Sequence, residues 1–144
     1  MREIIRESVK EAGSLDQVRD GVIAVLVREK QKQGKVGYVS GIITSDGPEH
    51  IQENVKILEQ RTREIAAREQ MPVFSAVDVF DDDLFARLKA ETLPQSAWQK
   101  FWREILGSGQ VTDIFMTQRW QVSTGSKDEH EAAMGNNLAV HYEK

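Results

Sequence analysis

Short apolar runs alternate with longer amphipathic segments through most of this chain, and this alternation constrains the fold more than any other feature. From residue 36 onward the predicted order is strand, helix, strand, helix, helix, strand, helix, strand. Such alternation is typical of a parallel sheet with helices on both faces. The sequence therefore predicts an α/β fold with a doubly wound, mostly parallel sheet of four to five strands, of the Rossmann or flavodoxin-like kind.

The predicted strands are short runs rich in β-branched and aromatic residues, at 36–43, 71–76, 111–116 and 138–142. Pro72 indicates that the second strand lies at an edge or only begins there, because proline cannot donate a ladder hydrogen bond. Ligands bind beyond the carboxyl ends of the strands in such sheets. We therefore expect the site among the loops 41–48, 76–82 and 117–126.

Three predicted helices connect these strands, at 48–68, 94–106 and 126–135. Pro48 suits the first turn of the first helix. Residues 78–93 are harder to assign, although the run Asp81-Asp82-Asp83 predicts the cap of a short helix.

The first 35 residues are predicted to be a helical extension of an α/β domain that spans 36–144. Ser14 and Gln17 form a capping-box pattern, and an apolar stripe at helical spacing follows it. Gly21 and the β-branched run 22–27 leave a strand as the competing interpretation. We expect this extension to act as a cover or as an interface.

Composition excludes several classes of function. The net charge is −4 with no evident basic patch, so binding to DNA or RNA is not favoured. There is no cysteine, which excludes disulfides, thiolate catalysis and zinc–sulfur sites. The three histidines, His50, His130 and His141, do not have metal-ligand spacing. We expect neither a metal nor a cofactor.

Nothing in the sequence indicates a membrane protein. No apolar run approaches the length of a bilayer span. The first seven residues mix charges too closely for a secretory signal. We therefore expect a cytoplasmic location.

The segment Gly125 to Glu129 carries the clearest functional signal, because a glycine-bearing turn there follows a predicted strand and opens a helix. Such a turn brings backbone N–H groups and an acidic side chain together at the carboxyl end of the sheet. We place Glu129 in the first turn of that helix. The alternative is that Glu129 only stabilises the helix dipole.

Three segments together resemble the nucleoside 2-deoxyribosyltransferase-like family, which includes 2′-deoxynucleoside 5′-phosphate N-hydrolases and uncharacterised bacterial and phage relatives. They are 38–43, which resembles the first strand and substrate loop; 113–116, which resembles the strand that opens with an aspartate; and 120–133, which resembles the loop-to-helix signature. The resemblance covers roughly residues 36–142. It implies cleavage or exchange of the N-glycosidic bond of a nucleoside or nucleoside monophosphate.

The resemblance also implies two catalytic residues. Glu129 would be the nucleophile toward the anomeric carbon, a role for which a carboxylate is competent without a metal. The start of the helix would help to keep Glu129 ionised. Asp113 would face the departing base, as a donor when protonated or as an orienting acceptor; otherwise it only begins a strand.

The substrate contacts implied by the resemblance come from both loops. Ser123 and the N–H groups around Gly125 and Ser126 would hold a 5′-hydroxyl or 5′-phosphate. Gly41 would let the backbone approach the sugar. The remaining expected contacts are Tyr38 on the first strand, Ile43 lining the base pocket, and Trp120, which either stacks on a base or plugs its loop.

Some alternatives stay open. The phosphohydrolase branch has an arginine where this chain has Thr44, and neither Arg119 nor Lys127 matches that position. The sugar, the acceptor and the need for a 5′-phosphate are therefore not decided. The competing functions are a non-catalytic nucleotide-binding or sensing module and an interaction protein that docks a partner through residues 1–35. The resemblance further implies a homodimer or higher homo-oligomer.

Overall fold

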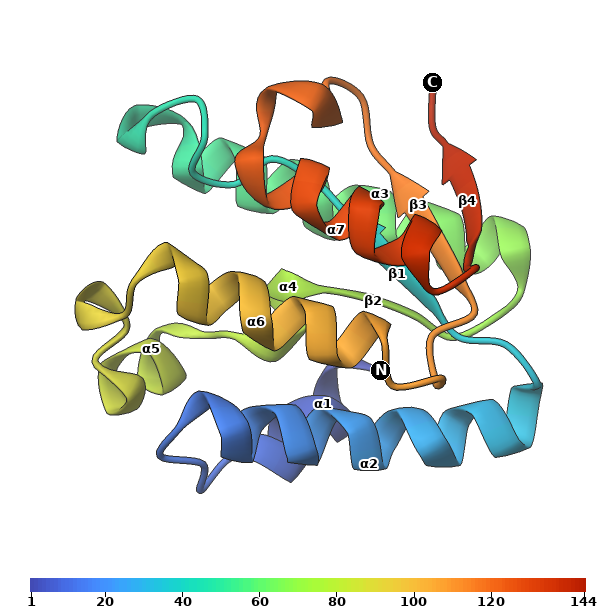
Figure 1. Cartoon of the computed structure of the whole chain (residues 1–144), viewed down its shortest axis with the longest axis horizontal. Helices are drawn as coiled ribbons and strands as arrows, with labels where there is room; N and C mark the ends of the chain where they lie inside the picture. The colour runs from blue at the N-terminus through green and yellow to red at the C-terminus, as the bar shows by residue number, and fades with distance from the viewer.

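The computed structural model describes all 144 residues and contains one parallel sheet with the strand order β2-β1-β3-β4 (Figure 1). The strands are β1 (Gly37–Ser40), β2 (Val73–Ser75), β3 (Asp113–Met116) and β4 (Ala139–Tyr142). In the sheet register Tyr38 is paired with Phe74 on one side and with Ile114 on the other. The predicted α/β class and parallel sheet are confirmed, with four strands.

Helices cover both faces of this sheet. They are α1 (Arg2–Val9), α2 (Leu15–Gln33), α3 (Ile51–Glu69), α4 (Ala76–Val79), α5 (Asp82–Leu88), α6 (Gln95–Leu106) and α7 (Thr124–Gly135), with short 3-10 turns η1 (Pro48–His50), η2 (Ala90–Thr92) and η3 (Trp120–Val122). Figure 1 shows α6 and α7 in front of the sheet, α3 behind it, and α2 below the sheet in this view. Alternate side chains of β1 follow these layers, because Val39 packs with Leu58 of α3 whereas Tyr38 belongs to the larger core on the opposite face.

The N-terminal segment is part of the main hydrophobic core. Fully buried residues of α1 and α2 join the same cluster as the sheet: Ile5, Val18, Val22, Val25 and Leu26. The Arg2 side chain also pairs with Asp78 of α4 at 2.9 Å. These apolar residues were expected to form a cover or an interface, but the structure places them inside the protein, so no boundary of the core falls at residue 35.

Local signals decide the ends of several helices. Ser14 caps α2, as predicted, and a helix rather than a strand runs through residues 22–27. Asp81 caps α5 by accepting a hydrogen bond from the Leu84 N–H at 2.8 Å, which confirms the acidic cap. Upstream, Asp78 accepts a hydrogen bond from the Ser75 N–H at 2.9 Å, which forms part of a capping box at the start of the short helix α4.

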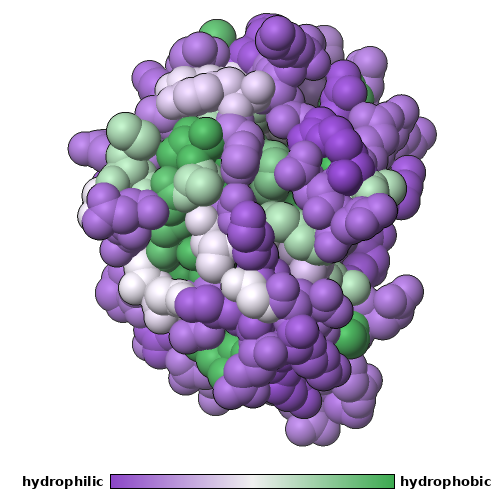
Figure 2. Space-filling view, turned by 90° about the vertical axis from the view of Figure 1, so that its right-hand side faces the viewer, coloured by the Kyte–Doolittle hydropathy of each residue, from purple (hydrophilic) through white to green (hydrophobic).

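The two ends of the sheet differ. Figure 2 shows the end where the strands begin, which is mostly hydrophilic with a few apolar patches. The strands run from there toward the opposite end, where β1, β2 and β3 pass into the loops expected to hold the site. No helix in the protein combines the length and the apolar character that a membrane crossing requires.

Candidate active site

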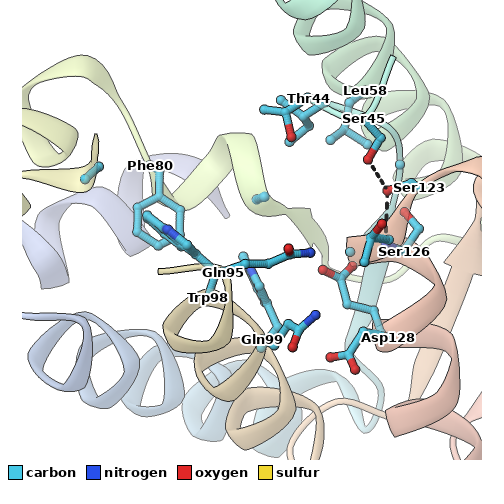
Figure 3. Close-up of a pocket in the computed structure, with 18 of the residues that line it drawn as sticks. Thr44, Ser45, Leu58, Phe80, Gln95, Trp98, Gln99, Ser123, Ser126 and Asp128 are labelled. Atoms are coloured by element: carbon cyan, nitrogen blue, oxygen red, sulfur yellow. Dashed lines mark hydrogen bonds between the residues drawn. The ribbon is translucent and has the colours of Figure 1, made fainter. Parts of the chain in front are cut away.

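A cavity of about 740 Å³ lies beyond the carboxyl end of β1. The chain leaves β1 toward β2 on one side and later returns to β3 on the other, so this is the point where the connections diverge. The segment after β1, the region from α4 to η2, and the helices α6 and α7 all contribute to its lining (Figure 3). The cavity is therefore where the doubly wound fold predicts a ligand site.

One wall of the cavity is rich in hydroxyl groups, contributed by Thr44, Ser45, Ser123, Thr124 and Ser126. Ser123 caps α7 by accepting a hydrogen bond from the Ser126 N–H at 3.2 Å. Ser45 donates to the Ser123 hydroxyl at 3.3 Å, which joins the β1 loop to the start of α7 (Figure 3). The result is a polar surface beside the first turn of a helix.

The opposite wall is aromatic, and its rings follow one another away from the sheet: Tyr38, Trp102, Phe80, Trp98 and Phe85. The Tyr38 and Trp102 ring centroids are 4.8 Å apart, and Phe80 and Trp98 meet edge to face at 5.2 Å. Phe85 ends the series and is 40% exposed. Such a wall offers an apolar, flat ligand several faces and edges to pack against.

Glu129 of α7 lines the same cavity and is fixed through one carboxylate oxygen. The Tyr38 hydroxyl donates to its Oε1 at 3.0 Å, and the Ser40 hydroxyl donates to the same atom at 2.7 Å. The Ser126 and Ser40 hydroxyls are 3.0 Å apart. Because Ser40 has only one hydroxyl hydrogen, Ser126 donates to Ser40 while Ser40 donates to Glu129. No hydrogen bond within the protein reaches Oε2, so that oxygen is available to a ligand.

Burial changes the ionisation of this carboxyl group. Desolvation raises the pKa of Glu129 from 4.5 to about 7, against the hydrogen bonds from Ser40 and Tyr38, which lower it, while the charge of Asp128 raises it further. Burial and the charge of Glu129 raise the pKa of Tyr38 well above 10, so Tyr38 stays protonated and remains a donor. Glu129 is therefore poised to change its charge near neutral pH.

The position of Glu129 corrects one expectation. The helix α7 begins at Thr124, so Glu129 lies in its second turn rather than its first. The helix dipole weakens beyond the first turn. The side chain faces inward toward β1, and burial outweighs any help from the start of the helix in keeping it ionised.

Seven of the nine predicted site residues line the cavity: Tyr38, Gly41, Ile43, Ser123, Gly125, Ser126 and Glu129. The reason for Gly41 differs from the expected one. A Cβ atom there would lie 3.0 Å from Leu58 Cδ1 and 3.0 Å from Thr117 Oγ1. The close packing of α3 and β3 against the strand end therefore accounts for this glycine.

Asp113 is a correction, because it does not line the cavity. It begins β3 beside Gly37, at the amino end of the sheet. A four-residue strand spans about 10 Å from one end to the other. Asp113 is buried there, and its Oδ2 shares a 2.8 Å hydrogen bond with His141 Nε2. The carboxylate thus fastens β4 to β3, and the expected contact with a departing base is wrong.

Trp120 is a second correction. Its ring stacks on His130 with centroids 4.3 Å apart, and Tyr142 lies beyond them. Trp120 is not among the residues that line the cavity. Of the two alternatives for this side chain, the structure supports the one in which it plugs its loop, because the ring packs on residues of α7 and β4 rather than facing the cavity.

Sequence reasoning missed several polar residues of the site, among them Glu91, Gln95, Gln99 and Asp128. Gln95 and Gln99 reach from α6 toward Ser126 and Asp128 on α7 (Figure 3). Their spacing of four residues put them on one helix face with Trp98, a signal that was visible in the sequence. Trp98 and Trp102 were interpreted only as core or interface residues, so the polar neighbours were passed over.

Comparison with protein-family models, with curated proteins and with solved structures gave no match. The structure holds no group of three or more histidine, aspartate or glutamate side chains arranged to bind a metal ion.

Proposed function

We propose that this protein cleaves or exchanges the N-glycosidic bond of a nucleoside, with Glu129 as the nucleophile. The observation that carries the proposal is the environment of this carboxylate. Glu129 is fixed by two hydroxyl donors on Oε1, its Oε2 is free, and the cavity around it has one aromatic and one hydroxyl-rich wall. The resemblance of the three sequence segments to deoxyribosyltransferase-like proteins supports the same reaction.

A nucleoside matches the two walls. Its base is flat and largely apolar on its faces, and it would pack against Trp98 and Phe80. Its sugar carries hydroxyl groups, which would meet Ser45, Ser123 and the first turn of α7. The C1′ atom joins base and sugar, and in this orientation it lies over Glu129.

The chemistry needs an ionised Glu129. Oε2 attacks C1′ while the C1′–N bond breaks, and the electron pair of that bond leaves with the base nitrogen, which takes a proton from water. The product is a glycosyl ester of Glu129. Water then attacks C1′, which frees the sugar and the carboxylate, or a second base attacks C1′ and gives a new nucleoside.

Tyr38 and Ser40 have two roles in this scheme. Their hydroxyls hold Oε1 and so orient Oε2 toward the substrate. They also lower the pKa of Glu129, which counteracts burial and keeps a fraction of the carboxylate ionised at neutral pH. The donors would thus make a partly buried, desolvated acid usable as a nucleophile.

The test is release of free base from a panel of nucleosides and nucleoside monophosphates, followed by chromatography. We expect release by the wild type and loss of release in Glu129→Ala. The matched control is Glu131→Ala, which removes an exposed carboxylate from the same helix outside this cavity. If no substrate yields free base, or if Glu129→Ala retains full activity, the proposal is wrong. Ligand-dependent thermal stabilisation without release would instead indicate a sensing module.

A further inference from the structure

Asp128 of α7 is a second carboxylate that lines this cavity, and an arginine of α6 holds it. It is 9% exposed, and Arg103 of α6 donates to both of its oxygens, from Nε to Oδ2 at 3.0 Å and from Nη2 to Oδ1. Arg103 does not line the cavity. It faces a smaller hollow of about 380 Å³ on the other side of Asp128, and its side chain is 57% exposed. The ion pair therefore forms a partition between the two hollows.

The charges around Glu129 make this partition important. β1 presents only the hydroxyls of Tyr38 and Ser40. The other charged side chains that line the cavity are Glu91 of η2 and Asp128, both acidic. An unpaired Asp128 would therefore oppose a negative charge on the neighbouring Glu129, with no cation on the cavity wall to offset it.

We propose that Arg103 is a positioning residue, which offsets part of the charge of Asp128 and holds the helix that carries the aromatic wall against the helix that carries Glu129. Trp98 and Trp102 are on α6, as is Arg103, whereas Asp128 and Glu129 are adjacent on α7. A bidentate arginine–carboxylate pair fixes both distance and orientation. The part of this inference that concerns turnover rests on the proposed function, whereas the part that concerns the charge of Glu129 does not.

Titration of the Glu129 carboxyl carbon by NMR tests the charge balance without any substrate, and comparison with Glu129→Gln assigns the signal. We expect Arg103→Gln to raise the pKa of Glu129, because it leaves Asp128 unpaired. Asp128→Asn should lower that pKa, because it leaves an uncompensated arginine. The double variant removes both charges and should titrate close to the wild type.

Arg19→Gln is the matched control, because Arg19 makes an ion pair with Glu104 of α6 away from the cavity. We expect it to leave the titration of Glu129 unchanged. If Arg103→Gln and Asp128→Asn both titrate like the wild type, the inference is wrong. Thermal melts of each variant show whether it is folded, and Arg103 is exposed enough for its loss to spare the core.

The second measurement is the pH profile of base release. Arg103→Gln should release base about three- to tenfold more slowly at pH 6, with the difference closing by pH 9, because a pKa rise of up to one unit has that effect. Arg103→Lys should restore most of the rate at pH 6, since it keeps the positive charge. A shifted titration in a protein that releases no base would refute the proposed function and leave the charge balance standing. A normal profile in an active Arg103→Gln variant would refute the positioning role.

Discussion

At the scale of single residues, Glu129 costs the folded protein stability whenever it is ionised. Its pKa rises from 4.5 to about 7 on folding, so the unfolded chain loses this proton first as pH increases. The stability associated with the neutral acid is fully present below about pH 4.5 and is lost as pH rises through about 7. This cost makes a partly buried acid at this position a candidate for a functional role.

Glu129→Gln keeps the shape of the side chain and removes the ionisation. We expect this variant to have a free energy of unfolding about 1–3 kcal/mol above that of the wild type at pH 8, with the gap closing near pH 4. Urea denaturation at the two pH values measures the difference. Glu131→Gln, on the exposed side of α7, should show no such pH-dependent gain. A Glu129→Gln protein less stable than the wild type at pH 8 would contradict the burial of a charged carboxylate.

Replacing Gly125 by alanine separates an effect on stability from an effect on substrate binding. A Cβ atom at this position would meet only Ser123 Oγ, at 3.9 Å, so alanine fits the first turn of α7. Because alanine is the better helix former, we expect Gly125→Ala to melt at the same temperature or higher. The added methyl group enters the cavity, so KM for a nucleoside should rise.

Gly37 provides the contrast, because a Cβ atom there would lie 2.7 Å from Met71 Cε and 2.8 Å from a ring carbon of Phe115. Gly37→Ala should therefore lower the melting temperature. Gly37 lies at the end of the sheet away from the cavity, so this substitution should leave KM unchanged in a folded variant.

For Gly125→Ala, an unchanged KM in a folded variant would show that the turn at the start of α7 does not contact the substrate.

The sequence placed Glu129 correctly at the cavity but misplaced Asp113, and the reason is geometric. Glu129 follows the strand, in the second turn of a helix that starts beyond the carboxyl end of the sheet. Asp113 opens the same strand and therefore lies at the other end, where His141 was available as its partner. A motif that lists both residues in order along the chain does not tell which end of a four-residue strand each one occupies.

At the scale of secondary structure elements, β1 supplies both packing and polar donors to the site. Tyr38 and Ser40 are two residues apart and therefore point to the same face. The Tyr38 ring packs on Phe74 and Trp102, while its hydroxyl reaches Glu129. One strand face thus serves as core near its middle and holds the Glu129 carboxylate at its end.

Removing either donor should shift the pH profile of base release toward higher pH. Tyr38→Phe keeps the ring contacts and loses one hydrogen bond that lowers the pKa of Glu129. Ser40→Ala should shift the profile further, because Ser40 makes the shorter bond and lowers the pKa more. The rate measured from pH 5 to pH 9 gives the shift. A profile that keeps its midpoint in both variants would mean that these hydroxyls do not stabilise the ionised acid.

Periodicity predicted the longer elements well and the short ones poorly. The apolar stripes of α3 and α6 and the apolar runs of the strands have lengths that distinguish helix from strand. Between 76 and 93 the chain forms α4, α5 and η2, each too short for a period to develop, so only the cap at Asp81 was visible. A stripe also does not tell what it faces, which is why Trp98 was assigned to the core or an interface rather than to a cavity wall.

At the scale of the whole molecule, the N-terminal helices also show that an apolar stripe does not identify the partner it packs against. The stripe on α2 predicted correctly that one face of the helix is buried, but it carried no information on the partner. In the structure that partner is the same core that supports Tyr38 and Trp102. The first 33 residues therefore share a core with the aromatic wall and help to hold it in place.

The distribution of charge over the molecule leads to the last prediction, which concerns the substrate. The protein has a net charge of −4, and its cavity is lined by Glu91, Asp128 and Glu129 without a single lysine, arginine or histidine. A phosphate group entering this cavity would find hydroxyls and helix amides but no cation. We therefore expect kcat/KM for a nucleoside to exceed that for its 5′-monophosphate by about tenfold or more. Tenfold corresponds to a difference of only about 1.4 kcal/mol in activation free energy.

Thr44 makes the cause of this preference testable, because it is exposed on the cavity wall beside Ser45, where the resemblance implies an arginine in phosphohydrolases. Thr44→Arg should raise kcat/KM for the monophosphate more than for the nucleoside, whereas Thr44→Gln, which adds length without charge, should change the ratio little. In the wild type, higher salt should narrow the difference in kcat/KM between the nucleoside and its monophosphate, because salt screens the carboxylates. Equal or better use of the monophosphate by the wild type would show that the amides at the start of α7 bind phosphate strongly enough to overcome the acidic lining.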